Sequence, residues 1–171
     1  MEKRSGAVTF AGGPVTLVGP EVKVGEKAPD FKLLDNSLAE KTLKDYEGKI
    51  KVISVVPSLD TGVCDAQTRW FNKDVTGLSS DVVVLTVSMD LPFAQARWCG
   101  AAGVKNVVTL SDHRDASFGT NYGFLMEGLR LEAHGVVVID KNDKVTYVEY
   151  VPEVTHAINF DGVLAAVKAL I

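Results

Sequence analysis

The sequence predicts an α/β fold built on a mixed sheet. Runs rich in β-branched residues alternate with segments of helical spacing, an order that implies parallel strands joined by right-handed crossovers. The turn signal Asp140–Asp143 separates two more apolar runs and predicts a hairpin, so antiparallel strands join the sheet. This pattern by itself supports a three-layer α/β arrangement. We expect one domain over residues 1–171, with residues 1–20 as an N-terminal hairpin extension.

The predicted elements follow in chain order. The first two strands flank the turn Ala11–Pro14 and form the N-terminal hairpin. In chain order the predicted strands are Val8–Phe10, Val15–Val18, Phe31–Leu34, Lys51–Val56, Val82–Met89, Val107–Leu110, Gly135–Ile139 and Val145–Val151. The chain closes with a helix whose apolar face holds Val163, Val167 and Leu170.

The segment that follows the strand Lys51–Val56 is the most informative in the chain. It reads Pro-Ser-Leu-Asp-Thr-Gly-Val-Cys and leads into a helix, so Cys64 falls in the first helical turn. The unpaired N–H groups and the helix dipole there favour a thiolate over a thiol. Pro57 ends the strand, and Thr61 can cap the helix while it offers a hydroxyl beside the sulfur. A lone cysteine is most often a small buried hydrophobe, but this combination indicates chemistry.

Each of the two cysteines is predicted to lie on a helix that follows a strand. In the helix that carries Cys64, Ala66, Trp70 and Phe71 can share one face. For the next helix, Asp90 is the expected N-cap and a proline lies in the first turn. The second cysteine, Cys99, then falls near the end of this short helix.

These motifs resemble the active site of the peroxiredoxins, whose pattern is Pro-x-x-x-Thr/Ser-x-x-Cys. The segments Pro57–Arg69 and Ser88–Gly100, together with the opening Val8–Leu17, are similar to one branch, the atypical two-cysteine thiol peroxidases. The likeness covers nearly the whole chain. It implies a thioredoxin-like fold, a peroxidatic Cys64 and a resolving Cys99.

The same resemblance implies an antioxidant enzyme that reduces hydrogen peroxide and alkyl hydroperoxides without a cofactor. The Cys64 thiolate would attack the peroxide and become a sulfenic acid. Cys99 would then form an intramolecular disulfide with Cys64, which thioredoxin would reduce. Thr61 would help to hold the peroxide oxygens, and Pro57 would shield the site from water. Members of this branch are typically homodimers, so a homodimer is expected.

One position departs from the thiol peroxidase pattern. The branch usually has Ala-Arg-Ala before the strand that corresponds to Val136–Asp140, and that arginine supports the peroxidatic thiolate. This chain has His134 at the arginine's position. A histidine is mostly neutral at pH 7 and would stabilise a thiolate less than a permanent cation. Arg130 is a candidate substitute if Arg130–Gly135 is extended, although about 13 Å of strand would separate it from His134.

Composition argues against several other classes of protein. The net charge of −4 and the lack of a basic stripe argue against a nucleic-acid partner, and no apolar run reaches the length of a membrane span. His113, His134 and His156 show no metal-ligand spacing, so we expect no metal and ordinary surface or loop histidines. Two cysteines are too few for a disulfide framework, which favours a cytoplasmic protein with a transient disulfide.

Two other hypotheses remain open. In a redox sensor, the same disulfide would switch binding, and a slow reaction would leave a stable oxidised complex. In a binding module with a thioredoxin fold, Cys64 would be structural and both cysteines would resist alkylation. Rapid thioredoxin-coupled turnover of cumene hydroperoxide would favour the enzyme.

Overall fold

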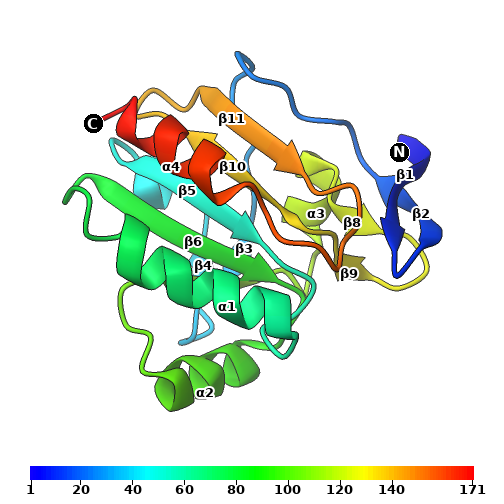
Figure 1. Cartoon of the computed structure of the whole chain (residues 1–171), viewed down its shortest axis with the longest axis horizontal. Coiled ribbons are helices and arrows are strands. Elements are labelled where there is room, and N and C mark those ends of the chain that lie inside the picture. Colours follow the sequence, from blue (N-terminus) through cyan, green and yellow to red (C-terminus); the bar gives the residue numbers. More distant parts are fainter.

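The computed structural model describes residues 1–171 and confirms a mixed α/β fold (Figure 1). The strands are β1 (Lys3–Phe10), β2 (Gly13–Val18), β3 (Leu33–Leu34), β4 (Glu40–Lys41), β5 (Ile50–Val55), β6 (Val82–Ser88), β7 (Val108–Ser111), β8 (Leu125–Met126), β9 (Leu131–Glu132), β10 (Gly135–Ile139) and β11 (Val145–Tyr150). The helices are η1 (Leu43–Tyr46, 3₁₀), α1 (Gly62–Trp70), η2 (Phe71–Val75, π), α2 (Pro92–Ala102), α3 (Ser117–Tyr122) and α4 (Phe160–Lys168). No helix combines the length and the apolar character needed to cross a membrane.

The central sheet has seven strands in the order β11-β10-β5-β6-β7-β3-β4. Strands β5, β6 and β7 are parallel, whereas β10 and β3 run antiparallel to their neighbours β5 and β7. All six residues of β5 are buried, as expected for a strand covered on both faces. Even Lys51 of β5 is fully buried, and its Nζ donates to Asp143 Oδ1 at 2.6 Å.

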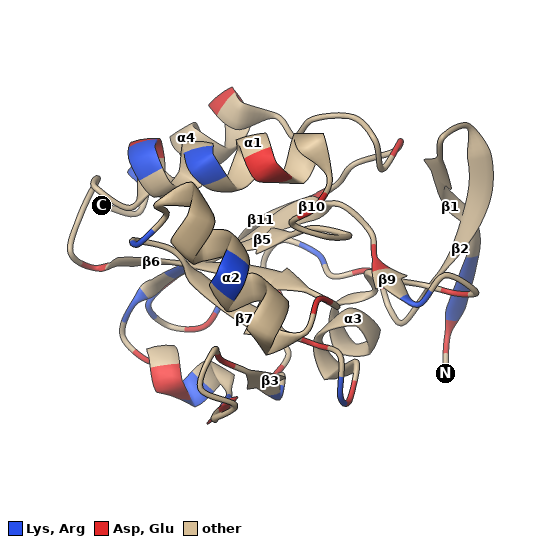
Figure 2. Cartoon of the chain, turned by 90° about the horizontal axis from the view of Figure 1, so that it is seen from below, with Lys and Arg blue, Asp and Glu red and all other residues tan.

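Two apolar clusters cover the two faces of this sheet. On one face, η2 and α4 bury Phe71, Val163 and Val167 against the strands. On the other face, Phe118 of α3 stacks on Tyr122 with ring centres 4.4 Å apart. Figure 2 shows α1 and α4 on one side of the sheet and α3 on the other.

The N-terminal hairpin belongs to a second sheet, with strand order β1-β2-β8-β9. The hairpin was expected, but the two strands that extend its sheet were not. Strand β8 pairs with β2 through Leu17 and Met126, and β9 pairs with β8. Strands of two residues carry no readable alternation, which explains why the sequence pattern did not indicate them.

The predicted apolar face of α1 was partly wrong. Ala66 is exposed, and the buried side chains of the helix are Cys64, Gln67 and Thr68, followed by Phe71 in η2. Two of these are polar and are buried because they find internal partners. Hydropathy spacing could not identify such a face.

The topology brings the two cysteine segments to one edge of the sheet. Helix α1 follows β5 and α2 follows β6, and these adjacent strands run in the same direction. The carboxyl ends of adjacent parallel strands lie at the same edge, where α/β proteins place their sites. The first turns of α1 and α2 therefore lie at this edge. Cys64 is in the first turn of α1, whereas Cys99 is near the opposite end of α2.

Candidate active site

Cys64 lies at a small pocket at the start of α1. The thiol is free, and the residue is 2% exposed. The pocket, of about 210 Å³, is lined by Phe10, Pro57, Thr61, Gly62, Val63, Cys64, Val154 and Thr155. It thus contains three of the four residues singled out in the sequence, namely Pro57, Thr61 and Cys64, but not Cys99.

Different contacts shift the pKa of the Cys64 thiol in opposite directions. Burial raises the pKa of the thiol, and contacts with the Thr61 side chain and the Ser58 backbone lower it. The Asp90 carboxylate adds a smaller increase, and none of the charges acting on the thiol is positive. The sequence favoured a thiolate at the helix terminus, whereas in the folded dithiol protein the pKa of the Cys64 thiol is raised, and burial is the largest cause.

Thr61 occupies the N-cap position of α1, but its side chain does not cap the helix. Its hydroxyl instead donates to the carbonyl oxygen of Ser58 at 3.0 Å, so the expected capping bond was wrong. In this orientation the oxygen lone pairs can accept from a hydroperoxide O–H. Rotated toward the sulfur, the same hydroxyl donates to the Cys64 thiolate, which is the contact that lowers the pKa of the thiol.

Asp90 ties the loop before Cys64 to the end of β6. Its carboxylate accepts from Ser58 Oγ at 2.8 Å, from Leu59 N–H at 2.9 Å and from Ser88 Oγ at 2.7 Å. The prediction that Asp90 caps α2 was therefore wrong, since the N-cap is Leu91. The carboxylate is engaged by a loop distant in sequence, a tertiary contact that no local signal reveals.

Cys99 lies near the end of α2, as predicted, and is half-buried and free. Its sulfur is 4.0 Å from Thr109 Oγ1, and this hydroxyl donates to Asn36 Oδ1 at 2.9 Å. Burial raises the pKa of the Cys99 thiol, and the Thr109 hydroxyl partly opposes this. The structure therefore represents the dithiol state of the protein.

His134 lies in the short connection between β9 and β10, so its assignment to a loop is confirmed, but it is fully buried and not on the surface. Its Nε2 lies 2.5 Å from Gln67 Oε1, and its Nδ1 lies 2.9 Å from the carbonyl oxygen of His156. Gln67, one turn after Cys64, also donates to Ser54 Oγ at 2.7 Å. Burial lowers the pKa of His134, and the backbone contacts with His156 and Val154 partly oppose this. Through Gln67, the His134 side chain supports α1 from behind.

Arg130 does not replace the missing arginine. It is exposed in the turn between β8 and β9, with a left-handed φ of 53°. The segment Arg130–Gly135 is therefore not continuously extended. The expectation that the side chains of Arg130 and His134 point to the same face of a strand does not hold.

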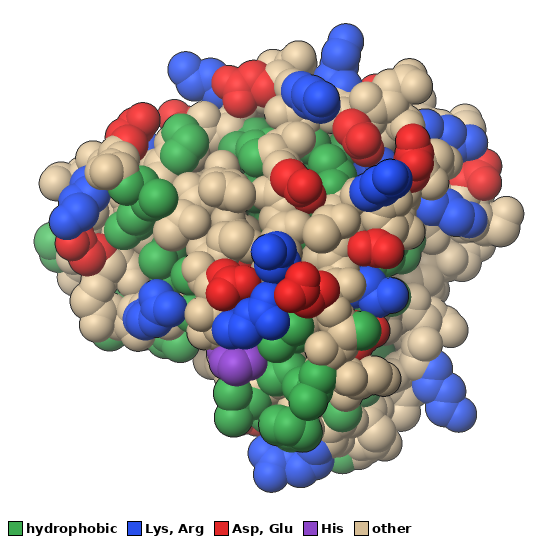
Figure 3. Space-filling model, turned by 180° about the vertical axis from the view of Figure 1, so that it is seen from behind, with side chains coloured by type: hydrophobic (Ala, Val, Ile, Leu, Met, Phe, Trp, Pro, Cys, Tyr) green, Lys and Arg blue, Asp and Glu red, His purple; other side chains and the backbone are tan.

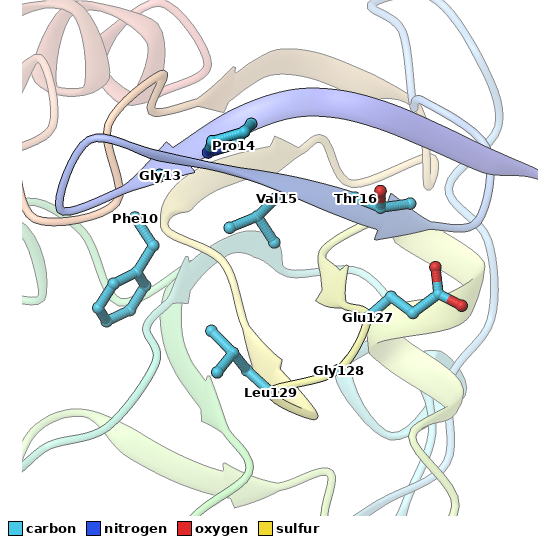
Figure 4. Close-up of a pocket in the computed structure, with 8 residues that line it drawn as sticks. All are labelled: Phe10, Gly13, Pro14, Val15, Thr16, Glu127, Gly128 and Leu129. Carbon is cyan, nitrogen blue, oxygen red and sulfur yellow. The ribbon is translucent and has the colours of Figure 1, made fainter.

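A second hollow adjoins the Cys64 pocket and shares Phe10 with it. This open groove, of about 530 Å³, is lined by Phe10, Gly13, Pro14, Val15, Thr16, Glu127, Gly128 and Leu129. Figure 4 shows Phe10 and Val15 of the hairpin facing Leu129 of the β8–β9 turn. Elsewhere, Figure 3 shows positive and negative side chains interspersed on the surface. No group of three His, Cys, Asp or Glu side chains is placed to hold a metal ion.

A thioredoxin-like fold with a cysteine at the start of the helix after a central strand defines a class of protein, the cysteine-based oxidoreductases. Comparison with known proteins shows to which family within this class the chain belongs.

The sequence profile named Redoxin matches residues 23–166. A thiol peroxidase of Bacillus subtilis is 60% identical over 164 residues, covering 96% of this chain and 98% of that protein. A thiol peroxidase of Staphylococcus aureus is 58% identical, covering 94% and 97%.

Solved structures of related proteins have the same fold. A peroxiredoxin-like protein from Aquifex aeolicus superposes with a TM-score of 0.90 at 44% identity, covering 98% of both chains. A thiol peroxidase from Chromobacterium violaceum shares the fold, with a TM-score of 0.82 at 19% identity and 95% coverage of both chains. The chain belongs to the redoxin family and, within it, to the thiol peroxidases.

Proposed function

We propose that this thiol peroxidase reduces hydrogen peroxide and alkyl hydroperoxides at Cys64, as part of antioxidant defence. The observation that carries the proposal is the Cys64 pocket, which places a free thiol with Pro57 and Thr61 at the start of α1. Phe10, Val63 and Val154 make much of its wall apolar, which suits the carbon chain of an alkyl hydroperoxide.

In the first step, the Cys64 thiolate attacks the terminal oxygen of the hydroperoxide. The O–O bond breaks, a sulfenic acid forms on Cys64, and the other oxygen leaves as water or an alcohol after taking up a proton. The Thr61 oxygen would accept from the hydroperoxide O–H and align the two oxygens with the sulfur. Pro57 would cover the thiol and exclude water, which strengthens the electrostatic interactions in the pocket.

In the second step, the Cys99 thiol condenses with the sulfenic acid. A Cys64–Cys99 disulfide forms within one chain, and a water molecule leaves. An external dithiol, which we propose to be thioredoxin, then restores both thiols by disulfide exchange. This need for a reducing thiol pool supports a cytoplasmic location.

We further propose that the chain acts as a single domain and as a homodimer. The hairpin of residues 1–20 would be an extension of that domain that contributes Phe10 to the pocket. Both points rest on the resemblance to the thiol peroxidases.

A steady-state assay with thioredoxin, thioredoxin reductase and cumene hydroperoxide tests the proposal. Cys64→Ser should abolish turnover, whereas Cys99→Ser should consume one equivalent of peroxide and accumulate a sulfenic acid that dimedone traps. Reaction of Cys64→Ser but not of Cys99→Ser would reverse the two roles. A slow parent reaction that leaves a stable oxidised complex would instead identify a redox sensor.

A further inference from the structure

We infer that Asp65, Arg69 and Trp98 form a latch between α1 and α2 whose release limits disulfide formation. This inference rests on the proposed function, because it concerns the step in which Cys99 attacks the Cys64 sulfenic acid. The three side chains are called the α1–α2 latch below, and we assign them a positioning role.

The latch joins the immediate neighbours of the two cysteines. Asp65 follows Cys64 in the chain, and Trp98 precedes Cys99. Trp98 Nε1 donates to Asp65 Oδ2 at 3.1 Å, so one hydrogen bond links the first turn of α1 to α2. The Trp98 side chain is half-buried and packs against a small apolar cluster formed by Val56, Leu59 and Cys64.

Arg69 completes the latch from the next turn of α1. Its Nε donates to Asp65 Oδ1 at 2.5 Å, and its guanidinium carbon lies 5.6 Å from the centre of the Trp98 ring. Its Nη1 also donates to the carbonyl oxygen of Ala102, at the end of α2, at 3.3 Å. An exposed ion pair at this spacing contributes little by itself. Here it holds the Asp65 carboxylate toward the indole, and this contact lowers the pKa of Asp65.

The chemistry of the step requires these contacts to separate. The Cys99 sulfur attacks the Cys64 sulfur, an S–S bond forms, and the S–O bond breaks. The thiol proton and the hydroxyl leave together as water. The Cys99 sulfur is oxidised by one formal unit and the sulfenic sulfur is reduced by one, so both reach the disulfide level without an external oxidant. A disulfide needs its Cα atoms within about 7 Å. In the folded dithiol protein, Cys64 lies in the first turn of α1, whereas Cys99 lies near the far end of α2, with its sulfur beside Thr109 of β7 and outside the Cys64 pocket.

At least one cysteine must therefore leave its helical turn, and its neighbour in the latch moves with it. Contacts that exist in the folded dithiol or sulfenic state but not in the reacting state slow the reaction. A hydrogen bond of this kind changes an equilibrium by about two- to tenfold. The delay matters because a second peroxide can convert a waiting sulfenic acid into a sulfinic acid.

Single-turnover kinetics with cumene hydroperoxide test the latch in the full-length protein. Trp98→Phe removes the indole N–H but keeps an aromatic ring beside Cys64, and Arg69→Gln removes the cation. We expect each variant to form the Cys64–Cys99 disulfide about two to ten times faster than the parent. The rate of sulfenic acid formation should not change, and less sulfinic acid should accumulate in excess peroxide. Quenching with dimedone and mass spectrometry separates the three products.

The matched control is Arg114→Gln, which removes an exposed arginine paired with Glu40 and Asp115 away from both cysteines. It should change neither rate. The latch is wrong if disulfide formation in both latch variants is no faster than in the parent. It is also wrong if both chemical steps change together, because that pattern indicates general loosening of the fold. If the parent forms no Cys64–Cys99 disulfide, the proposed reaction sequence is wrong, and the latch inference, which depends on that sequence, is wrong as well.

Discussion

Glu132 carries a buried proton whose effect on stability can be measured. Its side chain is fully buried in β9, and no N–H or hydroxyl donor reaches either carboxyl oxygen. Burial, followed by the hydrogen bond and charge of Asp112, raises the pKa of Glu132 well above its ordinary value. Asp112 accepts from the backbone N–H groups of Phe118 and Gly119 at 3.1 and 2.9 Å. In the folded protein, Glu132 is therefore the protonated partner that donates to the Asp112 carboxylate.

This proton makes the fold sensitive to alkali. Above about pH 4.3, Glu132 ionises in the unfolded chain but keeps its proton in the folded one. The folded state then binds more protons, so its contribution to stability is full at acid pH and falls as pH rises toward the folded pKa. The loss is about 1.4 kcal/mol per pH unit. Glu132→Gln retains a donor toward Asp112 and removes this loss.

Urea unfolding between pH 5 and 8 measures the difference in unfolding free energy between Glu132→Gln and the parent. This difference should grow by about 1.4 kcal/mol per pH unit and level off where the folded carboxyl ionises. In thermal scans it corresponds to about 3–6 °C per pH unit. Glu127→Gln, which alters an exposed carboxylate paired with Lys3, should show no such growth. A constant offset between Glu132→Gln and the parent at every pH would refute the shared proton.

Three further predictions concern the reaction. Because burial raises the pKa of the Cys64 thiol, the rate of its oxidation by peroxide should rise about tenfold per pH unit from pH 6 to 8; a flat stopped-flow profile would contradict this. His134→Arg should raise the rate at pH 7 by about tenfold or more, since an arginine partner lowers a pKa by about 1–3 units, and a rate equal to the parent's would show that no cation is needed. Hydrogen exchange should show less protection around Cys64, Cys99 or both after oxidation, and equal protection in the two redox states would exclude local unwinding.

The sequence predicted those parts of the molecule that local pattern determines. The apolar runs of β5, β6 and β10 indicated the central sheet, and the residues between Pro57 and Cys64 indicated the pocket. The contacts that adjust the site arise from tertiary structure. His134 contacts Gln67 because β10 pairs with β5. Asp90 contacts Ser58 because β6 also pairs with β5. Periodicity and capping rules carry no information about such pairs.

The residues that hold the Cys64 thiol and one residue that lines its pocket come from different parts of the chain. The Redoxin profile matches residues 23–166, and Phe10 lies outside this range although it lines the Cys64 pocket. The thiol and its supports thus belong to the part of the chain that the family profile matches, while Phe10 on one wall of the Cys64 pocket comes from the N-terminal hairpin. Such a wall can change in shape or polarity through evolution without disturbing the residues that hold the sulfur. Selectivity for different peroxides can therefore diversify in the hairpin while the chemistry stays constant.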